Sequence, residues 1–265
     1  IKACEKASKL LIRDFGEVEK LQVSIKGPSD FVSSADTKAE KIIIEELTKS
    51  KKNYSIISEE DGSKKKLDSE NYWIIDPIDG TTNFLHGVPH FAISIALKSN
   101  NEIISGLIFD PIKNEMFYAE KNNGAYFNNK RMKVSRKKIL EECLFATGGK
   151  KEIKSDLNTR KFGSAALDMA YVAAGRYDGY FQNHLHLWDI AAGIIIVKEA
   201  GGKINEIDSR INTEIEEVSL KLDLGNQEIK TNANNVNIYF NNNLIELSEI
   251  NLNIDIFSFL KENPI

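Results

Sequence analysis

The spacing of apolar side chains predicts two amphipathic helices and two strands in the first third of the chain. Residues 2–20 and 37–49 place apolar residues at helical intervals among lysines and glutamates, which is typical of helices with one face on a core. Residues 54–57 and 72–75 are short runs rich in aromatic and β-branched residues, and they predict strands. The second run has the composition of a strand that is buried on both faces.

The middle of the chain favours antiparallel strands bounded by Asn and Gly, at residues 91–98, 103–109, 115–120 and 125–134. Short turns between them predict a meander. Small and apolar residues on every side of residues 164–175 predict a buried helix. A strand at 177–181 and a helix at 190–200 are expected next, followed by short strands after residue 203 with a turn at 241–243.

Composition and charge limit the classes of protein to which this chain can belong. With 265 residues, 42% of them hydrophobic, the chain can bury the core of one large domain or of two tightly joined ones. A net charge of −4 argues against a dominant nucleic-acid surface, and residues 64–66 are interpreted as the main basic run, in a solvated loop. Direct nucleic-acid binding is therefore not expected.

Cysteine usage and hydropathy favour a cytoplasmic protein. Cys4 and Cys143 are the two cysteines, no apolar stretch reaches membrane-spanning length, and the opening residues carry too many charges for a signal peptide. We therefore expect a protein of the reducing cytosol with no membrane partner. His184 and His186 lie two residues apart, but no other histidine or cysteine cluster joins them, so a zinc site is not expected.

Two carboxylates follow the apolar run at 72–75, in the sequence Asp-Pro-Ile-Asp that begins at residue 76. Proline lacks a backbone donor, so we expect the strand to stop there, with Asp76 and Asp79 at its carboxyl end. Ligands bind at that edge in open α/β sheets, and two carboxylates on a rigid turn suit Mg²⁺. Gly80, Thr81 and Thr82 follow, with amides and hydroxyls that suit a phosphate if a helix begins there. Turn preference alone also explains such a sequence.

The nine residues 76–84 (Asp-Pro-Ile-Asp-Gly-Thr-Thr-Asn-Phe) resemble the signature of the inositol monophosphatase family, a group of magnesium-dependent, lithium-sensitive phosphatases. Trp188-Asp189 before a small-residue helix is similar to the family's second motif. The resemblance covers roughly residues 2–202. It implies an α/β fold, the αβαβα sandwich, with an amino-terminal α+β half at 1–135, a carboxyl-terminal α/β half at 136–265, and the site between them. A homodimer is also expected.

The resemblance also implies roles for individual residues. Two or three Mg²⁺ ions are expected per site. Their ligands would be carboxylates and one backbone carbonyl: Glu59, Asp76 and the carbonyl of Ile78 for one ion, and Asp76, Asp79 and Asp189 for another. Thr81, oriented by Asp36, and Glu59 are expected to position and deprotonate the attacking water. The expected substrate contacts are Gly80, Thr81, Thr82, Ser164, Ala165 and Gln182.

Several of these acids also have purely local interpretations. Asp36 or Thr37 could cap the helix at 37–49, with Glu40 completing a capping box, and Asp189 could cap the helix that follows it. Residues 59–61 are acidic and could simply form a solvated loop. Electrostatics nevertheless favours cations, because two carboxylates about 4 Å apart repel by about 4 kcal/mol at an effective dielectric near 20. Metal binding or proton uptake must relieve that repulsion.

The expected function is hydrolysis of inositol 1-phosphate or a similar small polyol phosphate. Relatives with this core act on adenosine bisphosphates, fructose bisphosphate or histidinol phosphate, and some bacterial relatives are regulatory proteins that work with the transcription machinery. The chain departs from the family pattern at Ser58, where glycine is usual, and at Gln182, where glutamate is usual. The connection at 148–163 is shorter than its family counterpart by about a helix, and the match is weak after residue 203.

Overall fold

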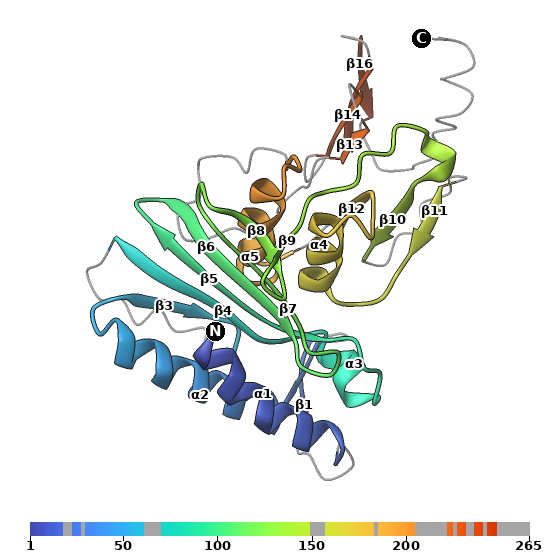
Figure 1. The fold of residues 1–265 in the computed structure, drawn as a ribbon. Coiled ribbons are helices and arrows are strands. Elements are labelled where there is room, and N and C mark those ends of the chain that lie inside the picture. Colours follow the sequence, from blue (N-terminus) through green and yellow to red (C-terminus); the bar gives the residue numbers. More distant parts are fainter. Residues whose placement is uncertain are drawn as a thin grey trace.

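A seven-stranded sheet is the centre of the fold (Figure 1), with the spatial order β3-β4-β5-β6-β7-β8-β9. The computed structural model describes residues 1–17, 23–27, 30–60, 70–148, 157–182 and 185–204, together with four strands between residues 222 and 247. The strands of the central sheet are β3 (Ser55–Ser58), β4 (Asn71–Asp79), β5 (Ala92–Ser99), β6 (Glu102–Asp110), β7 (Glu115–Glu120), β8 (Gly124–Phe127) and β9 (Lys130–Arg131). β3 and β4 are parallel, and the other neighbouring pairs are antiparallel.

Helices cover both faces of this sheet. α1 (Lys2–Phe15) and α2 (Ser34–Ser50) lie on one face, and α4 (Ala165–Ala173) and α5 (Leu187–Glu199) lie on the other (Figure 1). Next to α4 is a parallel three-stranded sheet of β11 (Asn158–Arg160), β10 (Leu144–Thr147) and β12 (Gly179–Phe181). The predicted mixed, layered α/β fold is therefore confirmed, while the boundary at residue 135 stays a prediction.

The remaining described elements are short. They are the hairpin of β1 (Val23–Gly27) and β2 (Asp30–Ser33), α3 (Thr81–Leu85), a 3-10 helix at Leu140–Glu142, and an antiparallel sheet of β13 (Leu222–Leu224), β14 (Gln227–Thr231), β15 (Val236–Phe240) and β16 (Asn243–Leu247). None of the described helices has the length and apolar character needed to cross a membrane. The basic run at 64–66, His184 and half of the short connection at 148–163 (residues 149–156) lie outside the described residues.

β4 and β5, in the middle of the central sheet, are buried on both faces because successive side chains point into opposite layers. Ile74 packs in the apolar cluster formed with α4 and α5, whereas Ile75 packs in the cluster formed with α1 and α2. Ala92 and Ile93 divide between the same two clusters on β5. The prediction of a strand buried on both faces is thus confirmed.

The predicted end of β4 was wrong. The strand continues through Pro77 to Asp79, and its pairing with β5 shifts register between Asp76 and Asp79. A bulge tolerates a residue without an N–H donor, so proline does not end the strand here. Both aspartates still lie at its carboxyl end, as predicted.

Other predicted boundaries also differ from the structure. α2 begins at Ser34, so Asp36 and Thr37 lie inside its first turn and do not cap it. The single strand expected at 125–134 is instead the β8–β9 hairpin, because Asn128 and Asn129 adopt φ of 43° and 66° and reverse the chain. α1 ends at Phe15, and α5 begins at Leu187, three residues before its predicted start.

Gly106 on β6 allows α5 to lie directly against the sheet. A Cβ atom at this position would be 2.5 Å from Cγ2 of Ile195 and 2.6 Å from the carbonyl oxygen of Ala192, which are both on α5. The second of these atoms is backbone, so a side chain at residue 106 can be accommodated only by moving the helix.

We predict that Gly106→Ala lowers the free energy of unfolding by about 1–3 kcal/mol, as overpacking of a well-packed core does. The matched control is Ser105→Ala on the same strand, which should change stability by less than about 0.5 kcal/mol. Urea unfolding of both variants is the measurement. Equal midpoints for the two variants would show that α5 does not depend on the absent side chain.

Candidate metal and phosphate site

Three carboxylates meet at the carboxyl end of β4. Asp76 and Asp79 come from that strand and Asp189 from the first turn of α5, and one oxygen from each lies within 4.8 Å of the others. Asp76 is 1% exposed and Asp79 is 8% exposed. Carboxylate oxygens at this separation fit a hard divalent cation such as Mg²⁺. The fold thus brings together three of the residues that the sequence predicted as metal ligands.

Backbone amides hold Asp76 and Asp189 in place. The Ile78 amide donates to Oδ1 of Asp76 over 3.0 Å, and the His186 amide donates to Oδ2 of Asp189 over 2.7 Å. The hydrogen bond from His186 to Asp189 is a capping contact at the start of α5, which was the alternative interpretation of Asp189. The two interpretations are compatible, because a carboxylate offers a second oxygen to a cation.

Asp79 is held by the amino-terminal end of α4. Its carboxylate accepts hydrogen bonds from the Ser164 hydroxyl at 2.5 Å, the Ala166 amide at 2.7 Å and the Ala165 amide at 3.3 Å. Ser164 is also the N-cap of α4, where its hydroxyl oxygen accepts from the Leu167 amide. The polar groups of Ser164 and Ala165 are thus directed at Asp79, and their contact with substrate stays a prediction.

Glu59 lies beside the three aspartates, at the end of β3. Its amide donates to the Ile75 carbonyl over 3.2 Å, which fixes the chain after β3 against β4. Burial raises the pKa of Asp76 well above its ordinary value, and the charges of Glu59, Asp79 and Asp189 raise it further. The site therefore favours either a bound proton or a bound cation.

Asp168 on α4 is a site residue that the sequence interpretation missed. Its side chain is 1% exposed, and its Oδ1 has no hydrogen-bond partner within the described part of the chain. Burial, and then the charge of Asp79, raises the pKa of Asp168 to about 8. The available signal was a single acid in the otherwise small and apolar run at 164–175.

The turn after β4 has the predicted form. α3 begins at Thr81, and Gly80 precedes it with φ of 100°, a conformation that favours glycine. The Thr81 hydroxyl lies 3.1 Å from Oδ1 of Asp36 and 3.0 Å from the carbonyl oxygen of Ile78. Asp36 is fully buried, and the contact between Asp36 and Thr81 is the one that the sequence motif predicted.

Gln182 follows β12 and is half-buried. Its Oε1 accepts a hydrogen bond of 2.7 Å from the Tyr180 hydroxyl, and Tyr180 is itself buried. The amide oxygen that was expected to face substrate therefore already has one protein donor. A second lone pair on that oxygen can still accept another hydrogen bond.

Comparisons with known proteins agree with this fold. The model of the inositol monophosphatase family matches residues 1–246. The inositol-1-monophosphatase of Rhizobium meliloti (strain 1021) is 46% identical over 217 residues, which cover 76% of this chain and 82% of that protein. The Nus factor SuhB of Escherichia coli (strain K12) is 38% identical over 221 residues, covering 78% of this chain and 83% of that protein.

A solved structure shows the same architecture. The crystal structure of the extragenic suppressor protein suhB from Bartonella henselae is similar with a TM-score of 0.72 and 48% identity, covering 76% of this chain and 83% of that chain. The fold and its buried acids therefore define a protein of the phosphatase class. The chain belongs to the inositol monophosphatase family, as the motif at residues 76–84 indicated.

The pKa of Asp79 makes the stability of the metal-free protein depend on pH. Burial raises this pKa to about 6, against the lowering effect of Ser164 and of the Ala166 and Ala165 amides. Because the folded-state pKa is the higher one, the proton stabilises the folded state at low pH. That contribution is lost as pH rises through about 6.

We predict that, in EDTA, the free energy of unfolding of wild type falls by up to about 3 kcal/mol relative to that of Asp79→Asn as pH rises from about 4 to 7. One pKa unit corresponds to about 1.4 kcal/mol. The asparagine variant lacks the titrating group and retains an acceptor for the α4 amides. Urea unfolding across this pH range is the measurement, and Mg²⁺ at neutral pH should restore wild type only. Parallel stability curves for the two proteins would contradict the assigned shift.

Proposed function

We propose that this protein is a magnesium-dependent phosphomonoesterase that hydrolyses inositol 1-phosphate or a similar small polyol phosphate. The observation that carries the proposal is the cluster of three carboxylates, Asp76, Asp79 and Asp189, directly before a Gly-Thr-Thr turn. Membership of the inositol monophosphatase family supports the reaction class. Sensitivity to lithium, a homodimer and a cytoplasmic location are proposed with it.

The donor set fits Mg²⁺, because it consists of carboxylate oxygens and a backbone carbonyl. In this proposal Glu59, Asp76 and the carbonyl of Ile78 hold one ion, Asp76, Asp79 and Asp189 hold a second, and the site takes two or three ions. Bound Mg²⁺ supplies a water of lowered pKa and offsets negative charge on the phosphate and the leaving alkoxide. The high pKa of Asp76 supports this assignment, because burial and the charges of Glu59, Asp79 and Asp189 disfavour its ionised form, and a bound cation would offset those charges.

The other site residues position the reacting groups. Asp36 accepts a hydrogen bond from the Thr81 hydroxyl and so directs a lone pair of Thr81 toward the attacking water. Glu59 accepts the proton that the water loses. The backbone amides of Gly80 and Thr81, with the Thr82 hydroxyl, donate to the phosphate oxygens. Ser164 and Ala165 keep Asp79 in place at the edge of the substrate.

A second candidate function is a regulatory role with the transcription machinery. The observation that favours it is the 38% identity to a protein named Nus factor SuhB. The two functions can coexist on one chain. An assay of phosphate release with Mg²⁺, on inositol 1-phosphate, an adenosine bisphosphate, fructose bisphosphate and histidinol phosphate, separates them, because a purely regulatory protein turns over none of these.

We predict that Asp76→Asn and Asp189→Asn each lower kcat/KM by at least about 100-fold, more than the loss of a residue that merely supports a metal ligand. Both variants should fold, because asparagine still accepts from the Ile78 and His186 amides that hold the native carboxylates. Phosphate release and Mg²⁺ titration by calorimetry are the measurements.

The matched control for these variants is Asp110→Asn. Asp110 is also fully buried and also accepts backbone amides, from Ile112 and Lys113, but it lies outside the acid cluster. Its variant should keep wild-type Mg²⁺ affinity and turnover. Full turnover by Asp76→Asn or Asp189→Asn would contradict the assignment of these residues as metal ligands.

We predict that Gln182→Glu raises the preference for inositol 1-phosphate over glycerol 2-phosphate by roughly tenfold. Hydrogen bonds to charged acceptors contribute roughly 1.5–3 kcal/mol, against about 1 kcal/mol for neutral ones. The Tyr180 hydroxyl can hold a glutamate in the same place. Wild type should accept both esters with similar kcat/KM, and the metal requirement should not change.

The comparison of kcat/KM for the two esters in wild type and variant is the measurement. If wild type already prefers inositol 1-phosphate a hundredfold, or the variant behaves as wild type does, Gln182 does not face the substrate.

A further inference from the structure

A cleft of about 570 Å³ lies along the chain segment that follows β9. Its lining contains none of the three clustered aspartates. Apolar side chains from α4 and α5 contribute to it, among them Met169, Val172 and Val197. A cavity of this size with an apolar floor is typical of binding sites.

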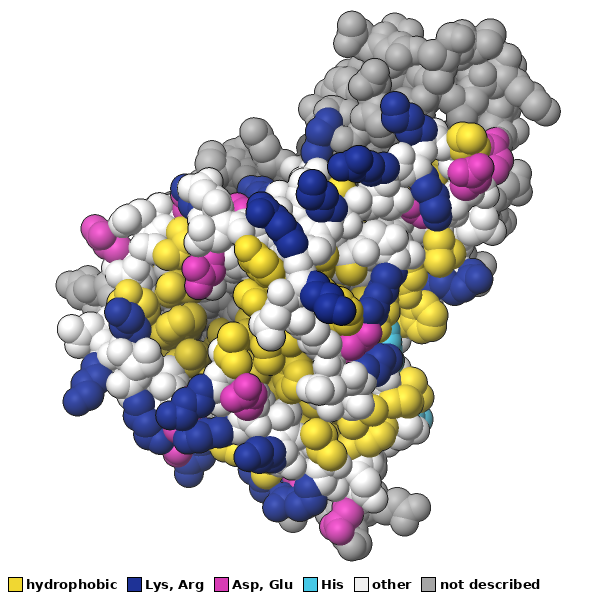
Figure 2. Space-filling view, in the orientation of Figure 1, with side chains coloured by type: hydrophobic (Ala, Val, Ile, Leu, Met, Phe, Trp, Pro, Cys, Tyr) yellow, Lys and Arg dark blue, Asp and Glu magenta, His cyan; other side chains and the backbone are white. Residues whose placement is uncertain are grey.

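The rim of this cleft is strongly basic. Residues 130–138, here called the basic strip, hold six cations and no acid: Lys130, Arg131, Lys133, Arg136, Lys137 and Lys138. All except Lys130 line the cleft. Figure 2 shows Lys and Arg side chains following this segment toward the 3-10 helix. The sequence interpretation placed the main basic run at 64–66 and overlooked this longer one.

Much of this positive charge is unpaired. Two acids line the cleft: Asp178 pairs with Lys137 of the strip at 3.1 Å, and Glu199 accepts hydrogen bonds from the Asn122 and Gly124 amides. The side chains of Lys133, Arg136 and Lys138 are exposed and make no ion pair within the described chain. Within the part of the chain that the structure describes, the strip therefore has three exposed cations without an ion-pair partner.

The first part of the strip has the alternation of a strand. Met132 is buried and Val134 half-buried against the core, while Lys133 between them is exposed. The amides of Met132 and Val134 donate inward, to the carbonyls of Ala125 and Ala200. The Lys133 amide has no hydrogen-bond partner among the described residues. An extended segment with outward-facing amides can accept another strand.

We propose that the basic strip and its cleft form a docking site for an extended acidic segment of a partner protein, in which aspartate or glutamate alternates with apolar residues. The acids would face the three exposed cations, and the apolar side chains would enter the cleft. A single-stranded nucleic acid fits less well, since such sites stack bases on aromatic rings. Tyr180, the aromatic residue in the described lining, is 4% exposed.

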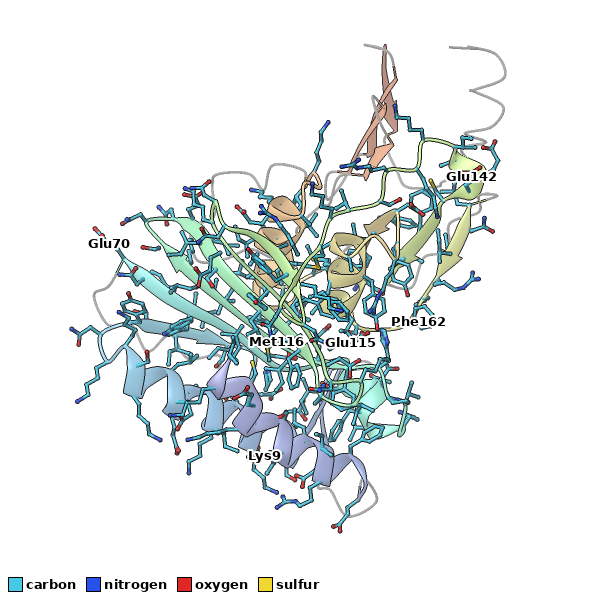
Figure 3. The ribbon with its side chains drawn as sticks, viewed as in Figure 1. Lys9, Glu70, Glu115, Met116, Glu142 and Phe162 are labelled. Atoms are coloured by element: carbon cyan, nitrogen blue, oxygen red, sulfur yellow. The ribbon has the colours of Figure 1, made fainter. Side chains whose placement is uncertain are left out.

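The experiment measures fluorescence anisotropy of a labelled short peptide that alternates glutamate with leucine. Comparison probes are a peptide that alternates lysine with leucine and an oligouridylate of equal length. The test variant is Lys133→Glu/Arg136→Glu/Lys138→Glu. The control is Lys9→Glu/Lys41→Glu/Lys52→Glu, three exposed lysines that also make no ion pair among the described residues. Figure 3 shows Lys9 on α1, on the opposite side of the molecule from Glu142 in the 3-10 helix at the far end of the strip.

We expect the acidic peptide to bind saturably to wild type and to the control, and at least about tenfold more weakly to the test variant, with binding that weakens as salt rises. The test variant should keep wild-type phosphate release and thermal midpoint, because its substitutions lie outside the acid cluster. The proposal is overturned if the acidic peptide does not saturate, if the test variant binds it as wild type does, or if oligouridylate binds more tightly.

Discussion

Repulsion among buried carboxylates at the end of β4 is the constraint that the surrounding structure must satisfy. Each carboxylate is held by backbone donors from its own segment or from a helix end: Ile78 for Asp76, the amino-terminal end of α4 for Asp79, and the residue before α5 for Asp189. Partial positive charge at helix amino ends stabilises the two aspartates beside it. These donors only reduce the repulsion, since the pKa of Asp76 remains well above its ordinary value. The remaining imbalance favours a bound proton or a bound cation at the site.

Holding the acids together requires α4 and α5 to pack closely on the central sheet. Gly106 removes a side chain where α5 meets β6, and Gly193 removes one where α5 meets Met169 of α4. Because interiors are packed as densely as organic crystals, small displacements at these contacts are transmitted along rigid helices. The apolar layer therefore determines how far Asp189 lies from the two aspartates of β4. The packing of α4 and α5 and the spacing of the three aspartates therefore depend on each other.

The sequence predicted the layers and most of the acid cluster for reasons that are local to the chain. Adjacent residues such as Ile74 and Ile75 have the apolar character of a two-sided strand, and the motif at 76–84 identified a strand end rich in oxygen donors. Tertiary context decided the rest. Pro77 is accepted in a bulge that exists only because β5 pairs there, and the burial of Asp168 depends on neighbours far along the chain. In the first part of the basic strip, cations alternate with the core-facing residues Met132 and Val134, so the strand pattern assigned that stretch to scaffold.

The hydrogen-bond donors of Asp79 are synthesised long after Asp79 itself. They lie 85, 86 and 87 residues further along the chain, and Asp189 follows later still. Domains form as the chain leaves the ribosome, amino-terminal part first. On a nascent chain that has emerged only as far as β9, Asp76 and Asp79 are hydrated carboxylates without their helix partners. An ion site that uses all three aspartates would therefore be completed only after α5 has been synthesised.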